Sequence, residues 1–96
     1  MDSYTLFQKA DDDILHIARA SVQQWGLARA ERYILSLHES FERLAEFPDV
    51  GRNANKISPG YLQMESASHT IFYRKIENGI LIVRVLHERM DFTRHL

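Results

Sequence analysis

The chain has 96 residues, 45% of them hydrophobic and 26% charged, and this length and composition predict one folded domain, residues 1–96, with one modest core. Twelve basic against thirteen acidic residues give a formal net charge of -1, so no overall field draws the chain to nucleic acid or anionic lipid. The lack of cysteine excludes disulfides and thiolate zinc sites, and without a signal peptide or an apolar run of about 20 residues we expect a cytoplasmic protein.

The N-terminal segments predict a strand and then a helix. Residues 3–7 (SYTLF) are a β-prone run that ends where the spacing of apolar residues becomes helical. Asp11, Asp12 and Asp13 then fall in the first turn, where acidic groups interact favourably with the free N–H groups of a helix start. Consecutive positions point in different directions around a helix, so these carboxylates do not converge on a metal ion. An apolar stripe follows before Gly26 ends the helix, and it consists of Ile14, Ile17, Ala18, Val22 and Trp25.

A second helix is predicted from about Leu27 to Phe47. Its apolar stripe is Ala30, Ile34, Leu37, Phe41 and Leu44. Because one glycine separates the two helices, they must fold back on each other as a hairpin. Pro48 closes the second helix, and residues 48–60, which carry prolines, glycines and asparagines, form the one long loop.

The last third of the chain predicts three strands, 61–68, 69–76 and 80–87. Asn78-Gly79 between the last two is a strong signal for a two-residue hairpin turn. The element order is therefore β-α-α-β-β-β. We expect an α+β fold in which the helical hairpin packs on one face of a small, mostly antiparallel sheet.

The predicted turn determines which side chains share a face of the sheet. With Glu77 opposite Ile80, Tyr73 lies across from Arg84, and the face expected to pack on the helices carries Thr70, Phe72, Arg74, Ile76, Leu81, Val83, Val85 and His87. The other face looks away from both helices and is too apolar to be left to water. The alternative is that the tail, residues 88–96, or a second copy of the chain covers this face, but the tail is too short and too polar to cover a whole sheet. We expect this open face to bind a partner segment through Ile71, Tyr73, Lys75, Ile80, Ile82, Arg84 and Leu86.

Metal and nucleophile chemistry have weak support. No pair among the five histidines has a recognised ligand spacing, so no metal site is expected. Ser66 and Ser68 are close to His69 in sequence, but neighbours on a strand point to opposite faces, which disfavours a triad. A ribonuclease site needs a base, an acid and a cation over the phosphate. Spacing leaves that option open, because the required groups are present in His69, Tyr73, Lys75, Arg84 and His95.

Four segments together resemble one family: WGLARAERYILSL, LAEFPDVGR, GYLQMESASHTIFYR and RVLHERMDFTRHL. In this order they are similar to the ParE toxins of the RelE/ParE superfamily of bacterial type II toxin–antitoxin systems, over nearly the whole chain. The resemblance implies the β-α-α-β-β-β fold, inhibition of DNA gyrase and replication, and neutralisation by a ParD-like antitoxin that wraps the toxin. It also implies a hetero-oligomer with that antitoxin, which alone would bring DNA binding to the complex.

The resemblance also includes RelE-like ribosome-dependent mRNA endonucleases. Arg84 is similar to an arginine retained in that branch, but Met90 stands about where a catalytic aromatic is expected, and methionine is useless for proton transfer. Arg52 and Lys56 are the loop's only cations, too few to hold a phosphate transition state. We therefore favour a ParE toxin with no catalytic residue and no cofactor. Leu62 departs from the ParE pattern, since arginine is common there.

The C-terminal tail is predicted to bind the target or another partner without covalent chemistry, through Arg89, Met90, Asp91, Arg94 and His95. A third interpretation stays open, in which the chain is a non-toxic, partner-binding remnant of the same fold.

Overall fold

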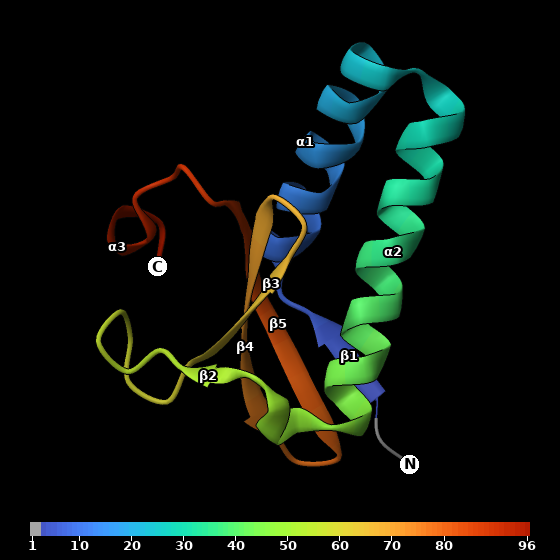
Figure 1. Cartoon of the computed structure of the whole chain (residues 1–96). Coiled ribbons are helices and arrows are strands. Elements are labelled where there is room, and N and C mark those ends of the chain that lie inside the picture. The colour runs from blue at the N-terminus through green and yellow to red at the C-terminus, as the bar shows by residue number, and fades with distance from the viewer. Residues whose placement is uncertain (1–2) are drawn as a thin grey trace.

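The computed structural model describes residues 3–96 and arranges them in two layers, a helical hairpin and a five-stranded sheet (Figure 1). The elements in chain order are β1 (Ser3–Leu6), α1 (Gln8–Trp25), α2 (Leu27–Glu46), a 3₁₀ turn η1 (Pro48–Val50), β2 (Arg52–Asn53), β3 (Leu62–Ser66), β4 (His69–Ile76), β5 (Gly79–His87) and α3 (Phe92–His95). The predicted α+β architecture is confirmed, with β2, η1 and α3 as additional short elements.

The sheet has the strand order β1-β5-β4-β3-β2. β1 runs parallel to β5, and the other neighbours are antiparallel. Parallel neighbours need a long crossover, and here the chain from Phe7 to Asn78 supplies it, including the helical hairpin and the three strands β2, β3 and β4. β1 pairs with Gly79–Ile82 alone, so the second half of β5, from Val83 to His87, has no strand on that side.

The two helices pack on the sheet through stripes at helical spacing. The buried residues of α1 are Ala10, Ile14, Ile17 and Ser21, and those of α2 are Ala30, Leu37, Phe41, Leu44 and Ala45. Gly26 joins the helices with φ of 86°, a conformation that glycine adopts without steric cost. Val22 was predicted to lie in the buried stripe of α1, but it is 41% exposed.

The turn of the β4–β5 hairpin lies one residue earlier than predicted. Ile76 pairs with Gly79, so Glu77 and Asn78 form the turn, and Asn78 has the positive φ, 67°. Gly79 is needed for another reason, because a Cβ there would overlap the backbone oxygen of Ser3 in β1. The turn preferences of residues 77–79 cannot predict this contact, because Ser3 lies far away in the sequence.

A β-bulge in β5 changes which side chains point to each face. Tyr73 pairs with Ile82, whereas Phe72 pairs with Arg84, so Val83 is the additional residue. The predicted pairing of Tyr73 with Arg84 is therefore wrong. Beyond the bulge, the alternation of side chains between the two faces is reversed relative to the first half of the strand.

The core against the helices contains residues that were predicted to form the open face. Four of them are fully buried there: Ile71, Tyr73, Ile80 and Ile82. Of the residues predicted to face the helices, Val85 lies in this core. Lys75 is exposed at the end of β4 in an ion pair with Asp49, and Arg84 and Leu86 belong to the other face. The prediction of an open docking face is wrong, because the molecule's own helices cover most of it.

Tyr73 shows why the inward face was misassigned. A buried tyrosine needs a partner for its hydroxyl group. Here the hydroxyl donates to the carbonyl oxygen of Pro48 at 2.8 Å and accepts from the N–H of Gly51 at 3.0 Å. A Cβ at Gly51 would overlap the Tyr73 ring and hydroxyl. The turn after α2 therefore supplies both hydrogen-bond partners of the Tyr73 hydroxyl group, so that this tyrosine can lie in the core.

The 54–61 loop and α3 lie on the side of the sheet away from α1 and α2 (Figure 1). A second, smaller apolar cluster covers the outer face of the sheet there. Phe72 and Leu86 are its sheet residues, and they are 0% and 1% exposed. The remaining members are Ala54, Ile57, Tyr61, Phe92 and Leu96. The rings of Phe72 and Phe92 meet edge to face at 5.0 Å. The tail and the 54–61 loop therefore cover the outer face together, although of the residues predicted for the open face only Arg84 and Leu86 lie there.

Candidate functional site

An exposed apolar groove of about 450 Å³ lies on the helical hairpin. Its lining residues come from both helices: Ala18, Val22, Leu27, Ala30, Glu31, Ile34 and Leu35. Leu27 and Leu35 are 63% and 61% exposed. Contiguous exposed apolar surface of this kind is typical of binding sites, so the groove is a candidate site for a partner.

The groove was missed from sequence because one apolar stripe was assigned to each helix. Leu27, Ile34 and Leu35 recur at helical spacing, partly offset from the buried stripe of α2. Val22 was counted as part of the core. The signal in the sequence was that the apolar residues of α2 cover a wider part of the helix surface than packing on the sheet requires.

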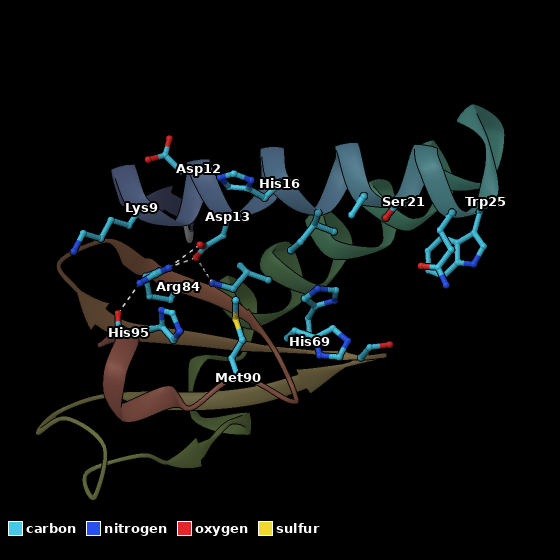
Figure 2. Close-up of a pocket in the computed structure, with 16 residues that line it drawn as sticks. Lys9, Asp12, Asp13, His16, Ser21, Trp25, His69, Arg84, Met90 and His95 are labelled. Carbon is cyan, nitrogen blue, oxygen red and sulfur yellow. Dashed lines mark hydrogen bonds and ion pairs between the residues drawn. The ribbon is translucent and has the colours of Figure 1, made fainter.

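A second hollow, of about 700 Å³, lies between α1, the unpaired half of β5 and the C-terminal tail (Figure 2). It is more polar than the groove, and its charged or imidazole side chains are those of Lys9, Asp12, Asp13, His16, His69, Arg84, His87 and His95. Among residues 3–96, no group of three or more histidine and acidic side chains is arranged to hold a metal ion.

Arg84 forms the floor of this cleft through an ion pair with Asp13 (Figure 2). Nε and Nη2 of Arg84 each donate to one carboxylate oxygen of Asp13 at 2.8 Å. The two side chains are 13% and 12% exposed, so water screens the pair weakly. The hydrogen bonds to Asp13 raise the pKa of Arg84 above its ordinary value, and the guanidinium stays charged.

Asp13 also covers the unpaired edge of β5. Its Oδ2 accepts a hydrogen bond from the backbone N–H of Val85 at 2.9 Å. The sequence predicted the acidic triplet as a helix-start signal, but α1 begins at Gln8 and Asp13 lies beyond the first turn. Its function in the fold is thus to pair with a strand 71 residues away in sequence.

His69 and His87 form a cross-strand pair at the other end of the cleft. Their rings meet edge to face at 5.3 Å. The Tyr33 hydroxyl lies 2.6 Å from Nδ1 of His69, and this contact joins α2 to β4. Burial lowers the pKa of His69, and the charge on a protonated His87 lowers it further, while Glu88 acts in the opposite direction. The neutral imidazole is therefore favoured.

The predicted tail residues are all exposed: Arg89, Met90, Asp91, Arg94 and His95. Met90 and His95 also line the cleft. The Asp91 side chain caps α3 by accepting from the N–H and hydroxyl of Thr93. The tail is thus an ordered segment with its polar side chains directed to solvent.

The five candidate groups for a ribonuclease site are divided between separate places. Arg84, His69 and His95 line the cleft. Tyr73 is buried beneath η1, and Lys75 pairs with Asp49. All three nitrogen atoms of the Arg84 guanidinium donate to other groups of the protein, and Asp13 balances its charge. Neither described long helix carries an apolar run able to cross a bilayer.

The structure describes a small α+β protein with an apolar groove on its helices, and comparison with known proteins identifies its family. The family model described as "ParE toxin of type II toxin-antitoxin system, parDE" matches residues 4–92. The chain belongs to this ParE toxin family.

Individual relatives match over nearly their whole length. "Toxin ParE1" of Mycobacterium tuberculosis is 38% identical over 94 residues, which are 97% of this chain and 96% of the relative. "Toxin ParE1" of Caulobacter vibrioides is 35% identical, covering 100% and 99%. "Toxin ParE" of Escherichia coli is 30% identical, covering 100% and 94%.

A solved structure shares the fold. It is described as "Chromosomal ParDE TA system from P. aeruginosa", and the chain matches it with a TM-score of 0.77 at 21% identity, covering 91% of this chain and 96% of that one.

Proposed function

We propose that the chain is the toxin of a ParDE pair, that it inhibits DNA gyrase and so blocks replication in the cytoplasm, and that a ParD-like antitoxin neutralises it in a hetero-oligomer. Membership of the ParE family and the similarity to a ParDE structure support the pairing. The net charge of -1 fits a protein that meets DNA only through its antitoxin.

The groove on the helical hairpin is the observation that best supports an antitoxin partner. An amphipathic segment recognises such a surface by inserting apolar side chains at helical spacing. Covering the exposed halves of Val22, Leu27 and Leu35 contributes about 1 to 2 kcal/mol for each side chain. We therefore place the antitoxin's amphipathic segment in this groove, instead of on the sheet face that the sequence predicted.

Two charge substitutions test the groove. Leu27→Glu and Leu35→Glu should each weaken antitoxin binding by about tenfold or more, because a charge would have to be desolvated inside the interface. Leu15→Glu is the matched control, since Leu15 is a 50% exposed leucine on α1 that does not line the groove. Isothermal titration calorimetry measures all three. Equal losses in the control and the groove variants would show that the groove is not the docking site.

The arrangement around Arg84 favours a non-enzymatic toxin over a RelE-like endonuclease. Asp13 balances the charge of Arg84, and each nitrogen of the guanidinium already donates to Asp13 or to the His95 carbonyl oxygen, which disfavours Arg84 as the cation that holds a phosphate. Met90, near the expected catalytic position, cannot transfer a proton. The purified chain should inhibit gyrase supercoiling and leave ribosome-bound message intact. Message cleavage with normal supercoiling would select the RelE-like alternative.

The exposed tail is proposed as a target-binding segment. Arg94→Glu reverses one exposed charge of α3, and it should reduce inhibition of supercoiling while leaving antitoxin affinity unchanged. Arg43→Glu reverses an exposed charge at the end of α2 and serves as the control. If both variants inhibit as well as the unmodified chain, the tail has no part in target binding.

A further inference from the structure

Arg84 lies where three separate elements meet: it belongs to β5, pairs with Asp13 of α1, and donates from Nη1 to the carbonyl oxygen of His95 in α3 at 2.5 Å (Figure 2). Within residues 3–96, this is the one hydrogen bond that joins α3 to a part of the chain outside the tail. The other attachment of α3 is apolar, through Phe92 and Leu96.

The geometry of the guanidinium links these contacts. Nε and Nη2 are both held by the Asp13 carboxylate, and this bidentate pair fixes the plane of the group. The remaining nitrogen, Nη1, then points at the C-terminal end of α3, where helix carbonyl groups lack intrahelical partners. Lysine has a single nitrogen on a flexible stem, so it cannot reproduce both contacts in one orientation.

Asp13 makes no described hydrogen bond to α3. Its partners are Arg84 and the N–H of Val85. Any effect of Asp13 on the tail must therefore act through the orientation of Arg84. Asp13, Arg84 and His95 all line the polar cleft beside α1. The contacts between α1, β5 and α3 therefore lie at a surface that a binding partner can reach.

We infer that Asp13 and Arg84 are positioning residues that couple α1 to the C-terminal tail: the ion pair orients the guanidinium, and the guanidinium holds α3 over Phe72 and Leu86. The presentation of Arg94 and its neighbours to a target then depends on this pair, a consequence that rests on the proposed role of the tail. The coupling itself concerns the isolated chain.

Limited trypsin digestion measures whether the tail is held. Trypsin cuts after Arg89 and Arg94 in the tail and after Arg19 and Arg29 on the helices, so the ratio of tail cleavage to helix cleavage separates local release from general unfolding. In Arg84→Lys and in Asp13→Asn this ratio should rise by about tenfold, as expected when one charge-assisted hydrogen bond is lost. Arg43→Lys, at an exposed position, should leave it unchanged.

The double variant tests whether the two residues act in series. If Asp13 acts through Arg84, Asp13→Asn combined with Arg84→Lys should raise the ratio no further than either single variant. Multiplying effects, or an unchanged ratio in either single variant, would overturn the coupling. A rise in all cleavage rates together would identify the pair as merely structural.

Gyrase supercoiling then tests the consequence for presentation. Arg84→Lys, in which the tail is released, should inhibit supercoiling as weakly as Arg94→Glu does. Full inhibition by a variant with a released tail would show that presentation of the tail does not depend on the Asp13–Arg84 pair. If the unmodified chain does not inhibit gyrase, the proposed target is wrong, but the digestion still decides the coupling because it needs neither gyrase nor antitoxin.

Discussion

The two faces of the sheet are covered in different ways. The inner face carries the whole helical hairpin, and its core includes the fully buried Leu37, Phe41 and Tyr73. The outer face is covered by the 54–61 loop and a helix of four residues, over the pair Phe72 and Leu86. The inner layer joins elements from almost the whole chain, whereas the outer layer is assembled from two short surface segments.

This difference separates global from local stability. Elements with many buried apolar contacts open only when the whole domain unfolds, whereas short, weakly attached segments open on their own. The outer cover is therefore the part that can move while the inner core stays folded. The two faces should respond differently to similar substitutions.

The largest expected effect belongs to the inner face. Phe41→Ala removes a fully buried ring that packs edge to face on Tyr4 at 5.4 Å. The free energy of unfolding should fall by about 3 to 5 kcal/mol, measured by urea denaturation. For a domain of this size that loss is a large share of the total stability. A fall below 1 kcal/mol would contradict the view that this face is the main core.

The junction between η1 and the inner core should show the next largest effect. Gly51→Ala places a methyl group where the Tyr73 hydroxyl lies, and we expect a loss of about 1 to 3 kcal/mol in unfolding free energy. Adding Tyr73→Phe removes the hydroxyl and should recover part of that loss. A double-mutant cycle by urea denaturation measures the coupling, and strictly additive losses would show that the two residues do not meet.

The outer face should respond mainly by local opening. Phe92 is partly exposed, so Phe92→Ala should reduce the free energy of global unfolding by about 1 kcal/mol or less. Amide hydrogen exchange in residues 88–96 should increase, while exchange in α2 stays nearly unchanged. If α2 loses protection equally, the tail belongs to the same cooperative unit as the inner core.

The smallest expected effect is a pH dependence at the end of the sheet. The pKa of His69 is lowered in the fold, first by burial and then by His87, against the opposing effect of Glu88 and Asp13. The unfolded chain therefore binds this proton more tightly. The contribution of His69 to stability is complete above about pH 6.5, its unfolded pKa, and is lost as the pH falls toward its lower folded value.

Thermal unfolding followed between pH 5 and 7.5 measures this dependence. Replacing His69 with glutamine should flatten the acid side of the stability curve. His16→Gln, at an exposed position on α1, should leave the curve as it is. An unchanged curve in the His69→Gln variant would assign the acid sensitivity to other groups.

Much of the fold was predictable from local patterns. α1 ends at Trp25, directly before the predicted stop at Gly26, and α2 runs from Leu27 to Glu46, within one residue of the predicted bounds. The spacing of apolar residues indicates both helices, and Gly26 and Pro48 indicate where they end. These signals lie within or next to each helix in the sequence.

The surfaces were less predictable because distant contacts decide them. A bulge at Val83, the close approach of β1 to Gly79 and the hydroxyl partners of Tyr73 together determined which face is buried. The pairing of Asp13 with Arg84 joins residues 71 positions apart, and neither spacing nor residue type signals it. Periodicity reports that a face is apolar, but it does not report what covers it.

The position of β5 between the first strand and the rest of the sheet has a consequence for how the molecule is made. β5 lies between β1 and β4 and also contacts α1, yet it is synthesised after both long helices and after the other four strands. A growing polypeptide that stops before Gly79 contains both long helices and β1, but it lacks β5, the strand with which β1 pairs. Newly synthesised molecules therefore complete the sheet only after β5 has been made, and fragments interrupted earlier should be degraded as unassembled chains.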